Sequence, residues 1–250
     1  ATCLPESCPP CNIFYTDLVV IPRVAALELE TRTRGTTNAL WTDSRKLRVT
    51  ASNVKCVPKM GATLPDNALA TLTNNTFRGN AATRHGQAYE PVAREDFGKE
   101  TGLVVSPCGT VVCAEETWLS ATPDGIIESH DAILEIKCPK VVNCKEKIST
   151  GKYDVRGTEG NYYLAKKGSY GFYSQVQFTM LCTQRQLCFL YVWSLKATVL
   201  LKIPFDESYI AENMPRLNRF YFSSMLPRLE EMYRSGKLSI CLEYRQLALM

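Results

Sequence analysis

A Pro-Asp-Gly turn followed by a short alternation of apolar and charged residues constrains this chain more than any other feature. Asp124 lies in the turn, and ten residues further on the segment 134–139 reads LEIKCP. Successive side chains of a strand point to opposite faces, so Glu135 and Lys137 are expected on one face with apolar neighbours on the other. The pattern therefore predicts a strand that presents a carboxylate and an ammonium beside a second carboxylate.

These groups match what the hydrolysis of a phosphodiester requires. The reaction needs a nucleophilic water and neutralisation of the charge that develops on the phosphate, and Mg²⁺ held by carboxylates provides both. Asp124 and Glu135 are the candidate metal ligands, with the backbone carbonyl of Ile136 as a third. Lys137 would then orient the water or stabilise the developing negative charge.

A simpler interpretation uses the same residues. Asp-Gly is a common turn signal, and a Glu/Lys pair is ordinary on an exposed strand. Because the spacing alone favours this simpler interpretation, the metal site depends on other motifs in the chain.

Five motifs that follow one another in order favour the metal site. They are RKLRVTASN at 45–53, GQAYEPVA at 86–93, SATPDG at 120–125, LEIKCP at 134–139 and YSQVQ at 173–177. From about residue 41 to 193, this succession resembles the bacteriophage lambda exonuclease family, also called the YqaJ-type viral recombinase family, of the PD-(D/E)xK nuclease superfamily. The resemblance implies an α/β fold with a restriction-endonuclease-like core, in which helices flank a mixed central sheet.

The resemblance also assigns roles to single residues. It implies that Asp124 and Glu135 bind the metal and that Lys137 is the catalytic lysine. Glu90 matches the family's helix-borne glutamate, and Gln175 matches the glutamine on the helix after the core sheet, so both join Lys137 as catalytic candidates. Without the motif order, Glu90 would be read as a solvent-facing helix residue and Gln175 as a partner for buried backbone groups.

A second group of residues matches the family's site for a 5′-terminal phosphate. Arg45, Thr50 and Ser52 fit its R-x-x-x-x-T-A-S pattern, and an arginine with two hydroxyls suits an anion because it supplies charge-assisted donors. The chain departs from the family at Thr122, where serine is usual, which keeps the hydroxyl. A further acidic residue of the family has only an approximate counterpart in the pair 115–116.

The implied activity is a 5′→3′ exonuclease that acts on double-stranded DNA ends and releases 5′-mononucleotides. The resemblance further implies Mg²⁺ as cofactor, with Mn²⁺ as a substitute, a ring of three subunits, and a single-strand annealing protein as partner. Two alternatives stay open. An endonuclease would use the same acidic site without the phosphate pocket, and a non-enzymatic DNA-end binding module would need no metal.

Composition fits these expectations. A chain of 250 residues with 45% hydrophobic residues buries a substantial core, and we expect one exonuclease domain over 41–250 after a partly helical N-terminal extension over 1–40. No apolar run approaches the length of a membrane span, so no membrane partner is expected. The net charge of +4 is only mildly basic and does not by itself indicate nucleic acid.

The eleven cysteines indicate a reducing compartment. An odd number cannot pair completely within the chain, and several lie in apolar runs typical of buried thiols, which favours a nuclear or cytoplasmic location. Cys3, Cys8 and Cys11 are spaced like part of a zinc knuckle. They lack a nearby fourth ligand, because His85 and His130 are the only histidines.

Periodicity predicts the remaining elements. We expect helices over 22–34, 80–100 and 170–182, a short helix capped by Thr50, a strand-rich stretch over 103–138, an antiparallel pair over 187–193 and 197–203, and a long amphipathic helix over 206–234. Residues 145–167 are basic and read as a loop. Their lysines and tyrosines make this loop a candidate DNA-facing surface, although a solvated connection explains the charge more simply.

Overall fold

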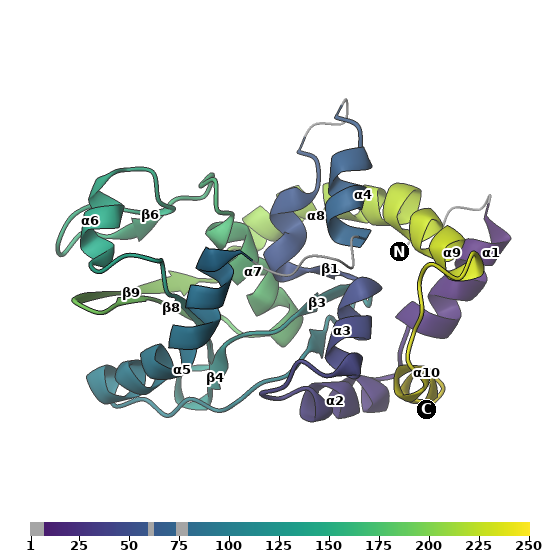
Figure 1. The fold of residues 1–250 in the computed structure, drawn as a ribbon, viewed down its shortest axis with the longest axis horizontal. Helices are drawn as coiled ribbons and strands as arrows, with labels where there is room; N and C mark the ends of the chain where they lie inside the picture. Colours follow the sequence, from purple (N-terminus) through teal and green to yellow (C-terminus); the bar gives the residue numbers. More distant parts are fainter. Residues whose placement is uncertain (1–7, 60–62, 74–79) are drawn as a thin grey trace. The chain divides into compact units, whose positions relative to one another are not determined.

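The computed structural model describes residues 8–59, 63–73 and 80–250, which belong to two compact units (Figure 1). The first unit comprises Ala1–Asn75, Cys108–Thr122 and Asp206–Met250, and the second comprises Thr76–Pro107 and Pro123–Phe205. The first unit thus joins N-terminal segments to the C-terminal part of the chain. The division expected between residues 40 and 41 stays a prediction.

The second unit is built on a mixed sheet of four strands in the order β4-β5-β8-β9. Only β5 and β8 run parallel; the two outer pairs are antiparallel. The strands are β4 (Gly125–Ile127), β5 (Ala132–Lys137), β8 (Leu187–Ser194) and β9 (Ala197–Pro204). The mixed sheet confirms the predicted α/β class, and the β8–β9 pair confirms the predicted hairpin.

Two helices of the second unit follow the sequence signals closely. Helix α5 (Ala81–Thr101) starts where the side chain of Asn80 accepts a hydrogen bond from the amide of Thr83, and it ends at Gly102, which has φ 70°. Its buried residues Ala93 and Phe97 pack in one core cluster with Leu134, Ile136 and other sheet residues. Helix α7 (Phe172–Thr183) is almost entirely buried.

The glycine of the Pro-Asp-Gly turn is required by close packing. A Cβ at Gly125 would lie 2.2 Å from Cγ1 of Val105 and 3.3 Å from the backbone oxygen of Ser106. Ser106 pairs with Ile126 in an antiparallel bridge, so the two chain segments cannot separate without breaking that bridge. The turn signal therefore reflects a tight backbone approach at the start of β4, directly beside Asp124.

The first unit is mainly helical, around a small sheet in the order β1-β3-β2. Its strands are β1 (Val49–Thr50), β2 (Val111–Val112) and β3 (Leu119–Ala121). Its α-helices are α1 (Pro9–Phe14), α2 (Arg23–Arg32), α3 (Ala39–Lys46), α4 (Asp66–Thr73), α8 (Glu207–Phe220), α9 (Leu226–Arg234) and α10 (Leu242–Ala248). None of the helices that the structure describes, in either unit, is long and apolar enough to cross a membrane.

A buried arginine ties distant parts of the first unit together. Arg48 is 1% exposed, and its guanidinium donates to the carbonyl oxygens of Val19, Ser44 and Thr117 at 2.7–2.9 Å. It also donates to the hydroxyl of Tyr244 at 2.8 Å. Removing it would leave several buried acceptors without a donor, so Arg48 is a structural residue.

Three expected elements differ from the structure. The strand-rich stretch 103–138 supplies two sheets, one in each unit, because β2 and β3 pair with β1 whereas β4 pairs with β5. The expected loop over 145–167 contains helix α6 (Cys144–Ser149) and the strands β6 (Val155–Arg156) and β7 (Tyr163–Leu164). The helix over 206–234 continues through a π-helical segment, Tyr221–Met225, between α8 and α9.

Thr50 precedes a short helix as predicted, but its side chain does not form the predicted capping hydrogen bond. A 3₁₀-helix, η2 (Ala51–Cys56), begins after Thr50, yet the Thr50 side chain does not bond to its amides. The hydroxyl lies instead 3.2 Å from the hydroxyl of Ser52.

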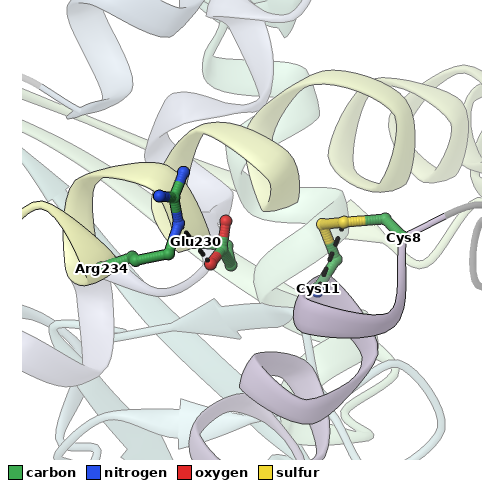
Figure 2. The surroundings of a disulfide bond; sticks show 4 residues. All are labelled: Cys8, Cys11, Glu230 and Arg234. Carbon is green, nitrogen blue, oxygen red and sulfur yellow. Dashed lines mark hydrogen bonds and ion pairs between the residues drawn. A yellow bond between two sulfur atoms is a disulfide. The ribbon is translucent and has the colours of Figure 1, made fainter.

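The cysteines are mostly thiols. Cys8 and Cys11 form a disulfide at the start of α1, and Figure 2 shows it near the Glu230–Arg234 ion pair of α9. Two of the three sulfurs proposed for a zinc knuckle are therefore joined to each other, and Cys3 lies outside the described residues. The other described cysteines form no disulfide. Of the cysteines in apolar runs, Cys182 and Cys188 are buried as expected, whereas Cys138 is only half-buried.

We expect Arg48→Met to lower the free energy of unfolding by about 3 kcal/mol, because buried acceptors lose charge-assisted donors. Urea unfolding followed by circular dichroism measures this change. Arg32→Met is the matched control, since Arg32 forms only exposed ion pairs, and its effect should be within about 0.5 kcal/mol. Equal effects of the two substitutions would contradict the structural role of Arg48.

Candidate active site

Strand β5 presents the charged residues of the LEIK segment on one face and its apolar residues on the other. Leu134 and Ile136 belong to the core cluster that includes Phe97. Glu135 is 4% exposed, and its carboxylate lies 2.7 Å from the ammonium of Lys137. The alternation expected from the sequence is therefore present, and it buries both charged side chains beside each other.

Gln175 closes a hydrogen-bonded triangle with these two residues. The Nζ atom of Lys137 donates to Oε1 of Glu135 at 2.7 Å and to Oε1 of Gln175 at 2.9 Å. The Nε2 atom of Gln175 donates to Oε1 of Glu135 at 2.7 Å. Because Gln175 comes from α7 and the other two from β5, the triangle fixes the helix against the strand.

Asp124 lies at the start of β4, next to the same strand. Its Oδ2 atom accepts a hydrogen bond from the amide of Ile136 at 2.6 Å, and its own amide donates to the carbonyl of Leu134 at 3.1 Å. In a strand, the N–H and C=O groups of one residue point to the same edge. The carbonyl of Ile136 is therefore directed to the edge that the Asp124 carboxylate occupies.

Burial, followed by repulsion between carboxylates, governs the electrostatics of this cluster. Burial, and then the negative charges of Glu135 and Glu90, raise the pKa of Asp124 well above its ordinary value. Burial also raises the pKa of Glu90, with Arg94 opposing the shift and Glu135 adding to it. For Lys137, burial disfavours the charged form, but the carboxylates of Glu135 and Asp124 outweigh it and raise the pKa. Lys137 is therefore protonated at neutral pH.

The donor set fits a hard divalent cation. Two carboxylates and one carbonyl oxygen are ligands of the kind that Mg²⁺ uses, and Mg²⁺ keeps several waters besides. Among the residues that the structure describes, no three His, Cys, Asp or Glu side chains surround one point as a complete metal site would require. The fit consequently depends on Asp124, Glu135 and the backbone of Ile136, and a cation there would relieve the repulsion that raises the Asp124 pKa.

Helix α5 contributes Glu90, which the sequence analysis proposed as catalytic. Its carboxylate pairs with Arg94 at 2.5 Å one turn further along the helix. Arg94 has a buried Nε atom without a hydrogen-bond partner in the described part of the chain. Arg94 follows Glu90 by four residues and so lies on the same face of α5, although no role for it was expected from the sequence.

Phe172 is a site residue that the sequence analysis missed. The ammonium of Lys137 lies 4.6 Å from the centroid of its ring, which allows a cation–π contact. The only signal in the sequence was the density of aromatic residues near the start of α7. Cys138, in contrast, is no nucleophile at neutral pH, because burial and the nearby Glu90 and Asp124 raise its pKa to about 12.

Arg45, Thr50 and Ser52 lie in the first unit, whereas the acidic cluster lies in the second. Thr50 and Ser52 place their hydroxyls 3.2 Å apart. Arg45 is 4.4 Å above the ring of Trp41, and burial lowers its pKa to about 10. No carboxylate in the described ranges pairs with Arg45, and the half-buried guanidinium faces the ring of Trp41 instead.

We expect Asp124→Asn to raise the thermal midpoint of the metal-free protein. Because the pKa of Asp124 is raised in the folded protein, the protonated carboxyl stabilises the fold, and this stability is lost as pH rises through that pKa. Asn does not ionise, so the midpoint of Asp124→Asn should exceed that of the unchanged protein by more at pH 9 than at pH 5. A gain of about 1 kcal/mol corresponds to roughly 2–4 °C. Scanning fluorimetry in EDTA measures it, and the exposed Glu95→Gln is the control. A lower midpoint for Asp124→Asn at pH 9 would contradict the repulsion described here.

Comparisons with known proteins agree with this geometry. A profile of the YqaJ-like viral recombinase domain matches residues 40–186, which is more than half of the chain. Among curated proteins, none matches the sequence. The structure is similar to that of an alkaline exonuclease from Laribacter hongkongensis (LHK-Exo), with a TM-score of 0.60 and 27% identity over 81% of this chain and 100% of that one. The same figures apply to its complex with dAMP.

A phage-related exonuclease from Haemophilus somnus 129PT shares the fold. The TM-score is 0.53 and the identity is 16%, over 77% of this chain and 97% of that one. The order of the motifs, the mixed sheet and the domain match agree. The chain belongs to the YqaJ-like viral recombinase family, whose lambda-exonuclease-like members have the PD-(D/E)xK nuclease fold.

Proposed function

We propose that the chain is a metal-dependent 5′→3′ exodeoxyribonuclease that hydrolyses double-stranded DNA from its ends to 5′-mononucleotides. The observation that carries this proposal is the hydrogen-bonded triangle of Lys137, Glu135 and Gln175 beside Asp124. Membership of the family supports a nuclease that hydrolyses phosphodiester bonds, and so does the similarity to the alkaline exonuclease from Laribacter hongkongensis.

Asp124, Glu135 and the carbonyl of Ile136 would hold Mg²⁺, or Mn²⁺ in its place. When bound, the ion supplies a Lewis acid that lowers the pKa of water and neutralises charge on the phosphate. Lys137 is protonated at neutral pH, so it cannot be the base that removes a proton from water. It acts as a fixed positive charge near the phosphate oxygens, where charge develops.

The neighbours of Lys137 hold it in position and keep it charged. Gln175 bonds to both Lys137 and Glu135, which leaves the ammonium little freedom to turn away. Glu90 adds a carboxylate with a raised pKa, which makes it a better proton acceptor than an ordinary glutamate. Gln175 and Glu90 thus position Lys137 and offer a proton acceptor, and both belong to the second unit.

The polarity of digestion is assigned through Arg45, Thr50 and Ser52. A half-buried guanidinium without a carboxylate partner can bind an anion, and a terminal phosphate is such an anion. The hydroxyls of Thr50 and Ser52 lie beside each other and can donate to the same group. These features support a 5′-phosphate site.

The assembly is proposed on the resemblance alone. A ring of three subunits around the duplex would close through one repeated contact and would keep the enzyme on its substrate. A single-strand annealing protein would then receive the 3′-ended strand. Light scattering measures the particle mass, and a strictly monomeric particle would refute the ring without affecting the chemistry.

Lys137→Ala should reduce the rate constant of cleavage by about 10²–10³-fold, since it removes a positive charge from the place where negative charge develops. Single-turnover digestion of labelled duplex in Mg²⁺ measures this rate.

Asp124→Asn and Glu135→Gln should abolish cleavage while duplex binding persists. Lys99→Ala, at an exposed pair on α5, should have the activity of the unchanged protein. Near-normal turnover of Asp124→Asn in excess Mg²⁺ would overturn the site.

Arg45→Ala should remove a preference for 5′-phosphorylated over 5′-hydroxyl duplex. The contact is worth roughly 1.5–3 kcal/mol, so the preference should be about 10- to 150-fold before the substitution and absent after it. Competition between the two substrates in one reaction measures the ratio. Lys55→Ala, on the exposed side of η2, is the control. An enzyme that is indifferent to the 5′ end would favour the endonuclease alternative.

A further inference from the structure

The hairpin formed by β6 and β7 has one apolar face and one exposed face. Val155 and Leu164 oppose each other and are buried, whereas Arg156 and Tyr163 oppose each other and are exposed. Tyr163 is 56% exposed, which is high for a large aromatic residue. Directly opposed residues of an antiparallel pair lie about 5 Å apart on the same face. The hairpin therefore presents a guanidinium beside an open aromatic ring.

An aromatic cluster starts just before β6, where the carbonyl of Tyr153 accepts a hydrogen bond from Nε of Arg156 at 3.5 Å, and extends to the candidate active site. The ring of Tyr153 lies 5.1 Å from that of Tyr170 and 5.3 Å from that of Phe172. Phe172 in turn contacts the ammonium of Lys137. Tyr170 is 38% exposed, so the cluster reaches the surface beside the catalytic lysine. In Figure 1, α6 and β6 lie next to each other near the β8–β9 hairpin, and all four elements belong to the second unit.

A buried carboxylate holds the cluster rigidly. Asp154 is 1% exposed and accepts hydrogen bonds from the amides of Tyr170 and Phe172, each at 3.0 Å. A Cβ at Gly168 would lie 2.0 Å from Cγ of Asp154, so only glycine allows the chain to pass this close. The aromatic rings are thus fixed before any ligand arrives, and the charge of Asp154 is turned inward to backbone amides.

Positive side chains outnumber the two exposed carboxylates of this segment, Glu146 and Glu159, around the rings. Lys147 lies 5.3 Å from the centroid of the Tyr153 ring and 5.7 Å from that of Tyr170. Lys152, Arg156 and Lys167 are exposed, and none of them pairs with a carboxylate in the part of the chain that the structure describes. Lys145 differs, because Glu159 binds it at 2.7 Å.

We propose that this surface, defined by Arg156, Tyr163, Tyr170, Lys147, Lys152 and Lys167, binds an unpaired DNA strand beside the active site. Cations follow a phosphate backbone, and exposed aromatic rings stack on bases only when those bases are free of their partners. A duplex offers few such bases away from its end. The proposal rests on the proposed function, because digestion of one strand produces the unpaired strand that would occupy this surface.

The test compares two DNA ligands on the full chain in EDTA, where cleavage is stopped. One is a blunt duplex, and the other carries a 3′ single-stranded tail with 2-aminopurine, whose fluorescence falls on stacking. Tyr163→Ala should weaken binding of the tailed DNA roughly 5- to 100-fold and restore the fluorescence, while binding of the blunt duplex changes less than about twofold. Tyr163→Phe should retain the affinity, because stacking needs the ring and not the hydroxyl.

The charge is tested separately. For the tailed DNA, Lys152→Ala combined with Lys167→Ala should reduce the magnitude of the slope of log affinity against log salt by about 1.4. Each lysine is expected to lose one phosphate contact, and each contact contributes about 0.7. Lys99→Ala should leave the slope unchanged.

The proposal is overturned if Tyr163→Ala and Arg156→Gln both bind tailed DNA as the unchanged protein does. It is also overturned if both ligands weaken equally, since that would indicate general attraction to DNA. Digestion of blunt duplex in Mg²⁺ is measured in parallel, so a chain that digests DNA but fails this test refutes the surface alone. A chain that digests no DNA refutes the proposed function.

Discussion

The desolvation and mutual repulsion of carboxylates at the edge of β5 is the constraint on which the candidate active site depends. Asp124 and Glu135, with Glu90 nearby, bring like charges together in a partly desolvated place, and the raised pKa of Asp124 expresses the cost. Lys137 offsets part of it through the bond to Glu135. The remaining negative charge is one that a divalent cation would offset, so the same feature that lowers stability is the basis of the proposed metal site.

The rest of the second unit supports this arrangement. β5 is buried between β4 and β8, which fixes the orientation of Glu135 and Lys137. α7 supplies Gln175, and the carboxylate of Asp154 holds the chain at the start of α7. A shift of α7 would therefore move Gln175 and Phe172 together. It would disrupt the two contacts that these residues make with Lys137.

Local patterns in the sequence predicted the parts of the fold whose causes are local. Alternation predicted the two faces of β5, and periodicity over 80–100 predicted the extent of α5. Partition of the strands between two sheets was not predictable, because β1 joins β3 across about 70 residues and no local pattern records such a pairing. The β6–β7 strands are two residues each, too short for alternation to be visible. Phe172 was missed because its contact with Lys137 is purely tertiary. The roles of the proposed site residues stay predictions.

One digestion of a linear duplex labelled at both ends tests the proposed exonuclease most directly. With Mg²⁺, a 5′-terminal label should appear at once as mononucleotide while the 3′-terminal label stays on long strands, and covalently closed circles should survive. Neither label should be released in EDTA. Release of the 5′ label in EDTA would contradict the metal site, and internal fragments or nicked circles at matched enzyme concentration would contradict the exonuclease.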